Sequence, residues 1–173
     1  TPYARKVVES RLPRRVNEQF ERIYWVKRDL IKKFYDLGGG HLITVGTDHP
    51  SWGEFLSGFG SHREVQAFVL AGIPPAAALK MGTINGGRAL RMGDQLGTIE
   101  PGKLADLFVV RGNPLADIRN TRNVRLVMVR GQLYEAAALL ESAKGKMGPA
   151  TPADDDWWKG SVGFKTASSS IAR

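Results

Sequence analysis

One aspartate follows an apolar run in a position suited to catalysis. Leu42 to Gly46 have the composition of a buried parallel strand, and Thr47 and Asp48 come directly after them. Barrel and open α/β enzymes place their chemistry at the carboxyl ends of such strands. A carboxylate there can bind a metal ion or take a proton from a metal-bound water. Asp48 is therefore the candidate catalytic and metal-binding residue, and a turn or helix-capping aspartate is the alternative.

The three histidines do not complete a metal site around this carboxylate. His49 directly follows Asp48, and neighbouring side chains of an extended chain point to opposite faces. His41 lies at the other end of the strand, about 20 Å away at about 3.3 Å per residue. His62 opens the next helix, where it either contacts a substrate or lies on the surface as a cap. We treat His49 and His62 as candidate substrate-binding residues.

A glycine- and aromatic-rich loop leaves the same strand. It covers residues 50–61 and contains Trp52, Phe55 and Phe59. Loops of this length at the carboxyl end of a strand are commonly functional. These aromatic side chains either wall a substrate pocket or anchor the loop, and Trp52 is the candidate substrate-binding residue among them.

The surrounding pattern predicts alternating helices and strands. Apolar residues recur at helical spacing over residues 16–36, three glycines then end the helix, and a strand follows over 41–46. Ser61 and Glu64 have the spacing of a capping box, which predicts a helix from there to Ala71. Two shorter helices are expected to follow, with their bounds at 74–81 and 85–90. This succession is typical of an αβ unit in a parallel sheet.

The hydrophobic period changes after residue 93. Strands are predicted over 105–111, 124–130 and 132–135, and the last two are joined tightly at Arg130-Gly131, a possible hairpin turn. A short Ala/Leu helix follows. Residues 144–173 are rich in Gly, Ser, Ala and Pro and are expected to be irregular.

Composition limits the classes of function. The chain has 173 residues, 42% of them hydrophobic, no cysteine and a net charge of +8. Residues 1–36 hold ten Lys/Arg and five Asp/Glu, so +5 of this charge lies there, interleaved with apolar residues as on a solvated helix face. We therefore expect neither nucleic-acid binding nor, without a run of roughly 20 apolar residues, a membrane span. Phosphate-loop, His-Glu-x-x-His and Gly-x-Ser-x-Gly motifs are absent.

Four segments in a fixed order resemble the metal-dependent amidohydrolases, in particular the imidazolonepropionase-like and prolidase-like branch. They are Gly46-Thr47-Asp48, His62-Arg63-Glu64, the stretch from Leu70 to Leu90, and Gly97-Thr98-Ile99-Glu100-Pro101-Gly102-Lys103-Leu104-Ala105-Asp106-Leu107-Phe108-Val109-Val110 with the strands up to Glu135. The resemblance covers roughly residues 24–135.

The resemblance implies an α/β fold: the C-terminal portion of a metal-dependent (β/α)8 TIM barrel, plus strands of the flanking small β-sandwich. Residues 1–93 would form the last part of the barrel, residues 94–135 the sandwich strands, and residues 136–173 a C-terminal helix and tail. By this resemblance Asp48 is the strand-8 aspartate of a metal centre holding one or two divalent ions, zinc being expected. The implied reaction is hydrolysis of amide or peptide-like C–N bonds, with deamination as a sister reaction.

Most of the implied barrel has no counterpart in this sequence. A complete barrel needs about 250 residues, and the other metal ligands of the family are missing here. We therefore expect the chain to be inactive alone and to work with the N-terminal portion of the same enzyme, as a separate or cleaved chain. A small-molecule or peptide substrate and homo-oligomerisation are also expected. The alternative is a non-catalytic scaffold or binding module.

Overall fold

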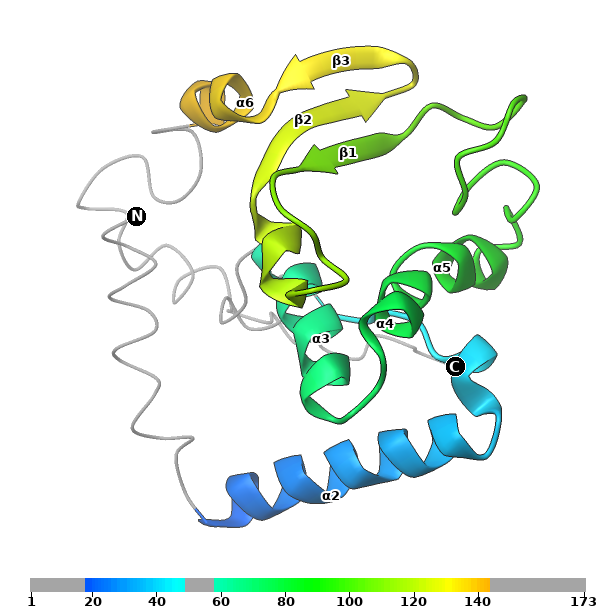
Figure 1. Cartoon of the computed structure of the whole chain (residues 1–173), viewed down its shortest axis with the longest axis vertical. Coiled ribbons are helices and arrows are strands. Elements are labelled where there is room, and N and C mark those ends of the chain that lie inside the picture. The colour runs from blue at the N-terminus through cyan, green and yellow to red at the C-terminus, as the bar shows by residue number, and fades with distance from the viewer. Residues whose placement is uncertain (1–17, 49–57, 144–173) are drawn as a thin grey trace, which may run out of the picture.

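A computed structural model describes residues 18–48 and 58–143. In chain order it contains helix α2 (Glu18–Asp36), helices α3 (Phe59–Leu70), α4 (Pro75–Met81) and α5 (Ile84–Ala89), three strands, and a final helix α6 (Ala136–Ala143). Helices α2 to α5 lie at one end of the molecule, and the sheet lies at the other with α6 beside it (Figure 1). The fold is thus of mixed helix and strand content. Among the described helices, none is long and apolar enough to cross a bilayer.

The glycine run after α2 forms a tight turn. Gly38 takes the left-handed conformation with φ of 90°, and its N–H donates to the Tyr35 carbonyl at 3.0 Å. A 3-10 turn, η1 (Gly39–Leu42), follows. The strand predicted over 41–46 is therefore wrong at its start, because His41 lies in this turn. From Ile43 the chain is extended.

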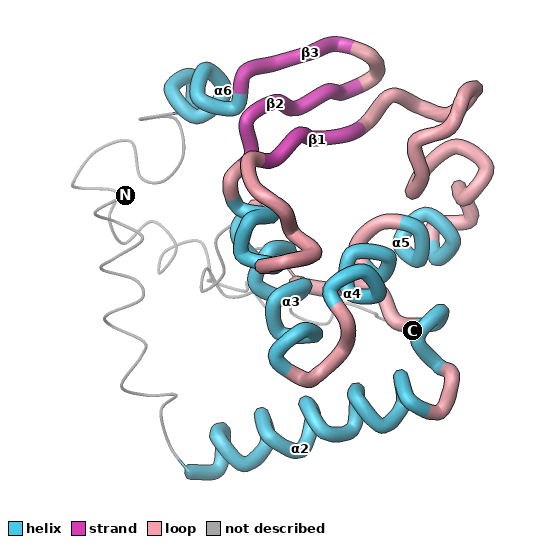
Figure 2. Tube along the Cα trace, viewed as in Figure 1, coloured by secondary structure: helices cyan, strands magenta, loops and turns pink. Residues whose placement is uncertain are grey.

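The segment 43–48 has no strand beside it in the described ranges, so it is extended chain without a ladder. An isolated extended segment lacks the backbone hydrogen bonds that define a sheet. Its flanks are instead helices: Figure 2 shows it running between η1 and α3, near α4.

The short helices begin where proline and glycine allow. Pro75 occupies the first turn of α4, as predicted for proline at a helix start. The capping box predicted at Ser61 is wrong: α3 begins earlier, at Phe59, after Gly58 with φ of 83°, and no side chain caps it. Ser61 lies inside the helix and does not cap it.

The strands form one antiparallel sheet in the order β1 (Leu107–Val110), β2 (Val124–Val129) and β3 (Gln132–Glu135). The tight hairpin is confirmed. Val129 pairs with Gln132, and both turn residues have positive φ, 50° at Arg130 and 79° at Gly131. Two left-handed residues in succession match the twist of the flanking strands. A 3-10 turn, η3 (Ile118–Arg122), precedes β2.

The core lies where the extended segment meets the helices. Its buried apolar residues come from the segment itself, from α3 and α4, and from η3: Ile43, Val65, Phe68, Ile73, Ala78, Met81 and Ile118. Ile31 and Tyr35 of α2 pack against this cluster from one side. The core therefore fixes the extended segment among helices that come from both sides of it in sequence.

Two glycines let the backbone between α5 and the sheet pack closely. A Cβ on Gly87 would come within 2.9 Å of the Leu96 carbonyl oxygen, and one on Gly97 within 2.9 Å of the Ile84 Cα. Gly97 also has φ of 96°. Only residues without a side chain fit this approach.

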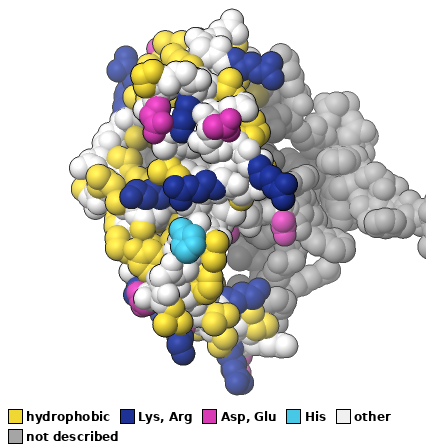
Figure 3. All heavy atoms as spheres, turned by 90° about the vertical axis from the view of Figure 1, so that its right-hand side faces the viewer, with side chains coloured by type: hydrophobic (Ala, Val, Ile, Leu, Met, Phe, Trp, Pro, Cys, Tyr) yellow, Lys and Arg dark blue, Asp and Glu magenta, His cyan; other side chains and the backbone are white. Residues whose placement is uncertain are grey.

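Several large apolar side chains remain at the surface. On one side of α2 and directly after it they are Ile23, Val26, Leu30, Phe34 and Leu37, with Leu30 65% exposed. At about 100° per residue these side chains lie within about 40° of Leu30, on a single stripe. Figure 3 shows apolar side chains reaching the surface beside rows of Lys and Arg. An apolar stripe of this length is unusual for a solvent-facing helix surface.

The core makes a prediction about stability. Met81→Ala removes a side chain that is only 1% exposed, so the free energy of unfolding should fall by about 2–5 kcal/mol in a denaturant titration. The matched control is Leu90→Ala, where a side chain 66% exposed is removed, and a change of about 0.5 kcal/mol or less is expected. Equal losses in the two variants would contradict the assignment of this core.

Candidate active-site strand

Asp48 lies at the carboxyl end of the extended segment, as its place in the sequence predicted. Its side chain is exposed, and its backbone is left-handed with φ of 48°. Aspartate tolerates this conformation better than most residues. Asp48 is the last described residue of the extended segment, and its φ differs from the extended conformation at Ile43.

Groups on three helices bond the segment that leads to Asp48: two side chains, on α5 and α3, and one backbone carbonyl, on α4. The Asn85 amide on α5 donates to the Gly40 carbonyl at 2.9 Å and to the Ile43 carbonyl at 2.7 Å. The Thr44 hydroxyl donates to the Met81 carbonyl at the end of α4, at 3.2 Å. The Gly46 N–H donates to Glu64 Oε2 on α3 at 3.0 Å. These bonds take the place of a strand ladder.

Sequence reasoning did not find the role of Asn85. The side chain is buried, with 7% of the residue exposed, and both of its contacts are with backbone carbonyls more than 40 positions away. The signal available in the sequence was a polar residue in the short helix expected over 85–90. Its partners could not be read from spacing, because they depend on how α5 packs on the extended segment.

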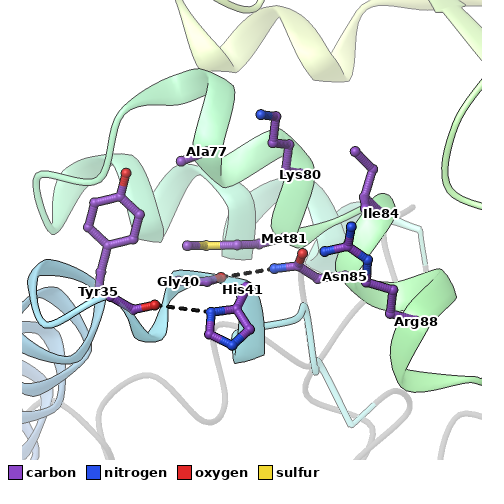
Figure 4. Close-up of a pocket in the computed structure, with 10 residues that line it drawn as sticks. Tyr35, Gly40, His41, Ala77, Lys80, Met81, Ile84, Asn85 and Arg88 are labelled. Atoms are coloured by element: carbon purple, nitrogen blue, oxygen red, sulfur yellow. Dashed lines mark hydrogen bonds between the residues drawn. The ribbon is translucent and has the colours of Figure 1, made fainter. Parts of the chain in front are cut away.

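A cavity of about 430 Å³ lies at the opposite end of the segment from Asp48. Tyr35, His41, Lys80, Met81 and Arg88 contribute side chains to its lining, and Asn85 forms one wall (Figure 4). His41 Nδ1 lies 3.0 Å from the Gly38 carbonyl oxygen. His41 lines this cavity and Asp48 does not, so the cavity is not beside the candidate carboxylate.

His62 lies on α3 and contacts the sheet. Its ring packs edge-on against Phe108 of β1, with ring centroids 6.1 Å apart. Partial burial lowers the pKa of His62 below its ordinary value of 6.5, and the positive charge of Arg122 adds to the effect. Within the described ranges, no interaction joins His62 to Asp48. Its predicted contact with a substrate stays a prediction.

The remaining predicted site residues cannot be placed. His49, Trp52 and Phe55 lie outside the described residues. Phe59, at the start of α3, stacks beneath the Arg122 guanidinium, 4.8 Å from the ring centroid. Phe59 therefore has a packing contact of its own, consistent with an anchor at the end of the loop.

The residues that the structure describes do not by themselves fit a metal ion. Within 18–48 and 58–143 no three His, Cys, Asp or Glu side chains come together as a ligand group. A catalytic zinc site needs about three protein ligands, and Asp48 supplies one carboxylate. Any metal bound here would take its other ligands from elsewhere.

Comparison with known proteins identifies the family of this chain. The profile of the amidohydrolase family matches residues 22–134, which include the extended segment, the helices and the sheet. The chain belongs to the amidohydrolase family.

Individual relatives agree with this assignment. The chain is 34% identical over 122 residues to adenine deaminase 4 of Rhizobium meliloti, covering 65% of this chain and 20% of the relative. It is 36% identical over 93 residues to a 5-methylthioadenosine/S-adenosylhomocysteine deaminase of Teredinibacter turnerae, covering 49% of this chain and 20% of that protein. The chain thus spans about a fifth of these curated relatives.

Solved structures resemble the same region. A Xaa-Pro dipeptidase with methionine bound in its active site matches with a TM-score of 0.56 and 38% identity, over 63% of this chain and 25% of that one. A putative prolidase from Bifidobacterium longum matches with a TM-score of 0.50 and 34% identity, over 59% and 27% respectively. Both matches cover about a quarter of the larger protein.

The buried amide makes a prediction. Asn85→Ala should lower the free energy of unfolding by about 1–3 kcal/mol, because two backbone carbonyls lose their donor. Chemical denaturation measures this loss. Gln95→Ala, which removes an exposed amide, is the control and should change little. A loss at Asn85 no greater than at Gln95 would show that these hydrogen bonds do not hold the segment.

The lowered pKa of His62 predicts a pH dependence. The unfolded chain binds this proton with a pKa near 6.5 and the folded chain with a lower one, so stability should fall as pH drops through about 6.5 towards the lowered pKa. His62→Gln should flatten that part of the stability profile, measured by thermal melting from pH 5 to 8. His41→Gln, at an exposed histidine, should leave the slope in place, and a slope unchanged in His62→Gln would refute the linkage.

Proposed function

We propose that this chain supplies the last strand of a metal-dependent amidohydrolase barrel, the helices that follow it and strands of the flanking small β-sandwich, to an enzyme that cleaves C–N bonds. The observation that carries this proposal is the family match over 22–134 together with Asp48 at the end of the extended segment. Carboxyl ends of barrel strands are where such enzymes place catalytic groups.

In this proposal Asp48 handles the proton of the reaction. Hydrolysis of a C–N bond requires a water to lose a proton and the leaving nitrogen to gain one. A carboxylate at the strand end would orient the water, accept its proton and pass it to the nitrogen. The divalent ion that the family resemblance implies, with zinc as the expected ion, would polarise the water, and its other ligands would come from the rest of the enzyme.

Dipeptide hydrolysis is the first candidate reaction. The solved structures that match this chain with TM-scores of 0.50 or more include a Xaa-Pro dipeptidase and a putative prolidase. Cleavage of a cyclic amide is a related possibility that the family resemblance implies. His49, His62 and Trp52 are the proposed substrate-binding residues, on or next to the loop that leaves the strand.

Deamination is the second candidate, favoured by the curated relatives, which are adenine and 5-methylthioadenosine/S-adenosylhomocysteine deaminases. Both reactions break a C–N bond by addition of water, so the same carboxylate would serve either. The two differ in the shape of the substrate pocket.

The proposed partner is the portion of the enzyme that the relatives carry in the rest of their length, in the same polypeptide or as a separate or cleaved chain. The extended segment has no described strand beside it, and the α2 stripe centred on Leu30 is exposed. Strands 1–7 of a barrel would pair with the extended segment and cover the α2 stripe. Alone, this chain would be inactive; homo-oligomerisation of the assembled enzyme is also proposed.

Substitution of the carboxylate tests the function. In the assembled enzyme, Asp48→Asn should reduce kcat by about 10²–10⁴-fold, the usual contribution of a general acid–base group. Xaa-Pro dipeptides, adenine and 5-methylthioadenosine are the substrates to assay with added zinc. Circular dichroism should show an unchanged fold, and Asp94→Asn, at an exposed aspartate, should keep full activity.

Two outcomes would count against the proposal. Full activity in Asp48→Asn would remove the carboxylate from the mechanism. No turnover of any of these substrates by the assembled wild-type protein would favour the alternative, a non-catalytic scaffold or binding module built on the amidohydrolase fold.

A further inference from the structure

Glu64 has a partner that its place in the sequence did not suggest. The spacing from Ser61 predicted that its carboxylate would bond within its own helix. In the structure, Glu64 Oε2 accepts the Gly46 N–H at 3.0 Å. This bond joins the first half of α3 to a position only two residues before Asp48, across 18 residues of sequence.

The position of this bond along the segment matters. Asn85 and Thr44 fix the amino half, through contacts at Gly40, Ile43 and Met81. In the carboxyl half, the Gly46 N–H donates to the Glu64 carboxylate. The two halves are thus held by different helices, and α3 holds the half that carries the candidate carboxylate.

Packing holds Val45, which lies against the core, but not Gly46 itself. A Cβ built on Gly46 would meet no atom within 4 Å, so the described surroundings there are open. Glycine has more backbone freedom than any other residue, and the left-handed Asp48 follows two positions later. A hydrogen bond to a carboxylate is stronger than one between neutral groups, so this contact can fix a backbone that packing leaves free.

We propose that Glu64 is a positioning residue for Asp48. Its carboxylate fixes the backbone at Gly46 and thereby sets the direction in which the chain presents the Asp48 side chain. Catalytic groups displaced by about 1 Å can lose about a hundredfold in rate. The effect on turnover rests on the proposed function, whereas the fixing of the segment does not depend on it.

Two variants of Glu64 in the assembled protein test this role. Glu64→Ala removes the acceptor, and Glu64→Gln keeps a neutral acceptor of the same reach. Exchange of the Gly46 amide hydrogen, followed by NMR, should be roughly tenfold or more faster in Glu64→Ala and intermediate in Glu64→Gln, given the strength of bonds to charged groups. Glu135→Ala, at an exposed strand residue, is the control and should leave Gly46 exchange unchanged.

Kinetics provide the second measurement. For a substrate turned over by the wild type, kcat should fall roughly tenfold or more in Glu64→Ala while KM stays within about twofold, because the substrate contacts are untouched. Partial rescue by Glu64→Gln is expected. Should Glu64→Ala fail to fold, Glu64→Gln carries the test alone, with faster exchange and a lower kcat expected.

The outcomes separate the two proposals. Unchanged Gly46 exchange in the Glu64 variants would overturn the positioning role, and so would faster exchange with an unchanged kcat. A wild-type protein that turns over no C–N substrate would overturn the proposed function, and with it any effect of Glu64 on turnover. Gly46 exchange would then still decide whether Glu64 holds the segment.

Discussion

The backbone of the extended segment must find hydrogen-bond partners outside a sheet, and the arrangement of the helices follows from that requirement. Buried N–H and C=O groups are rarely left unpaired. Here the partners of the backbone are an amide on α5, which donates to the Ile43 carbonyl, and a carboxylate on α3, which accepts the Gly46 N–H. The Thr44 side chain adds a bond to the last carbonyl of α4. Ile43 is buried in the same place, within the main apolar cluster. Polar and apolar contacts thus converge on one short stretch of chain, and the end of that stretch is Asp48.

Local chemistry could be predicted from the sequence where it acts over a few residues. The hairpin at Arg130-Gly131 and the proline start of α4 were predicted correctly, because turn conformation and the missing proline N–H are properties of the residues themselves. The start of the strand was wrong for a related reason. The glycines before His41 allowed a tighter turn than the apolar pattern suggested, and no described strand lies alongside to draw the chain into a ladder.

Long-range contacts could not be predicted. Asp48 became a candidate because an apolar run ends there, yet the residues that hold its segment, Asn85 and Glu64, lie 18 or more positions from their partners. Glu64 has a spacing that favours a local cap, and the earlier start of α3 removed that option. His62 shows the same limit. Its neighbour Phe108 belongs to a strand that only the folded chain brings to α3.

The close approach of Gly87 and Gly97 has a mechanical consequence. Backbone there contacts backbone, with no flexible side chain between to absorb a displacement. Contacts of this kind transmit force directly, since dense interiors deform little. The start of the loop that leaves α5 is accordingly a stiff joint, in which residues 96 and 97 have no room to shift towards α5. A side chain at position 87 or 97 would therefore displace the helix whose Asn85 donates to the Ile43 carbonyl, and so disturb the segment that ends at the candidate carboxylate.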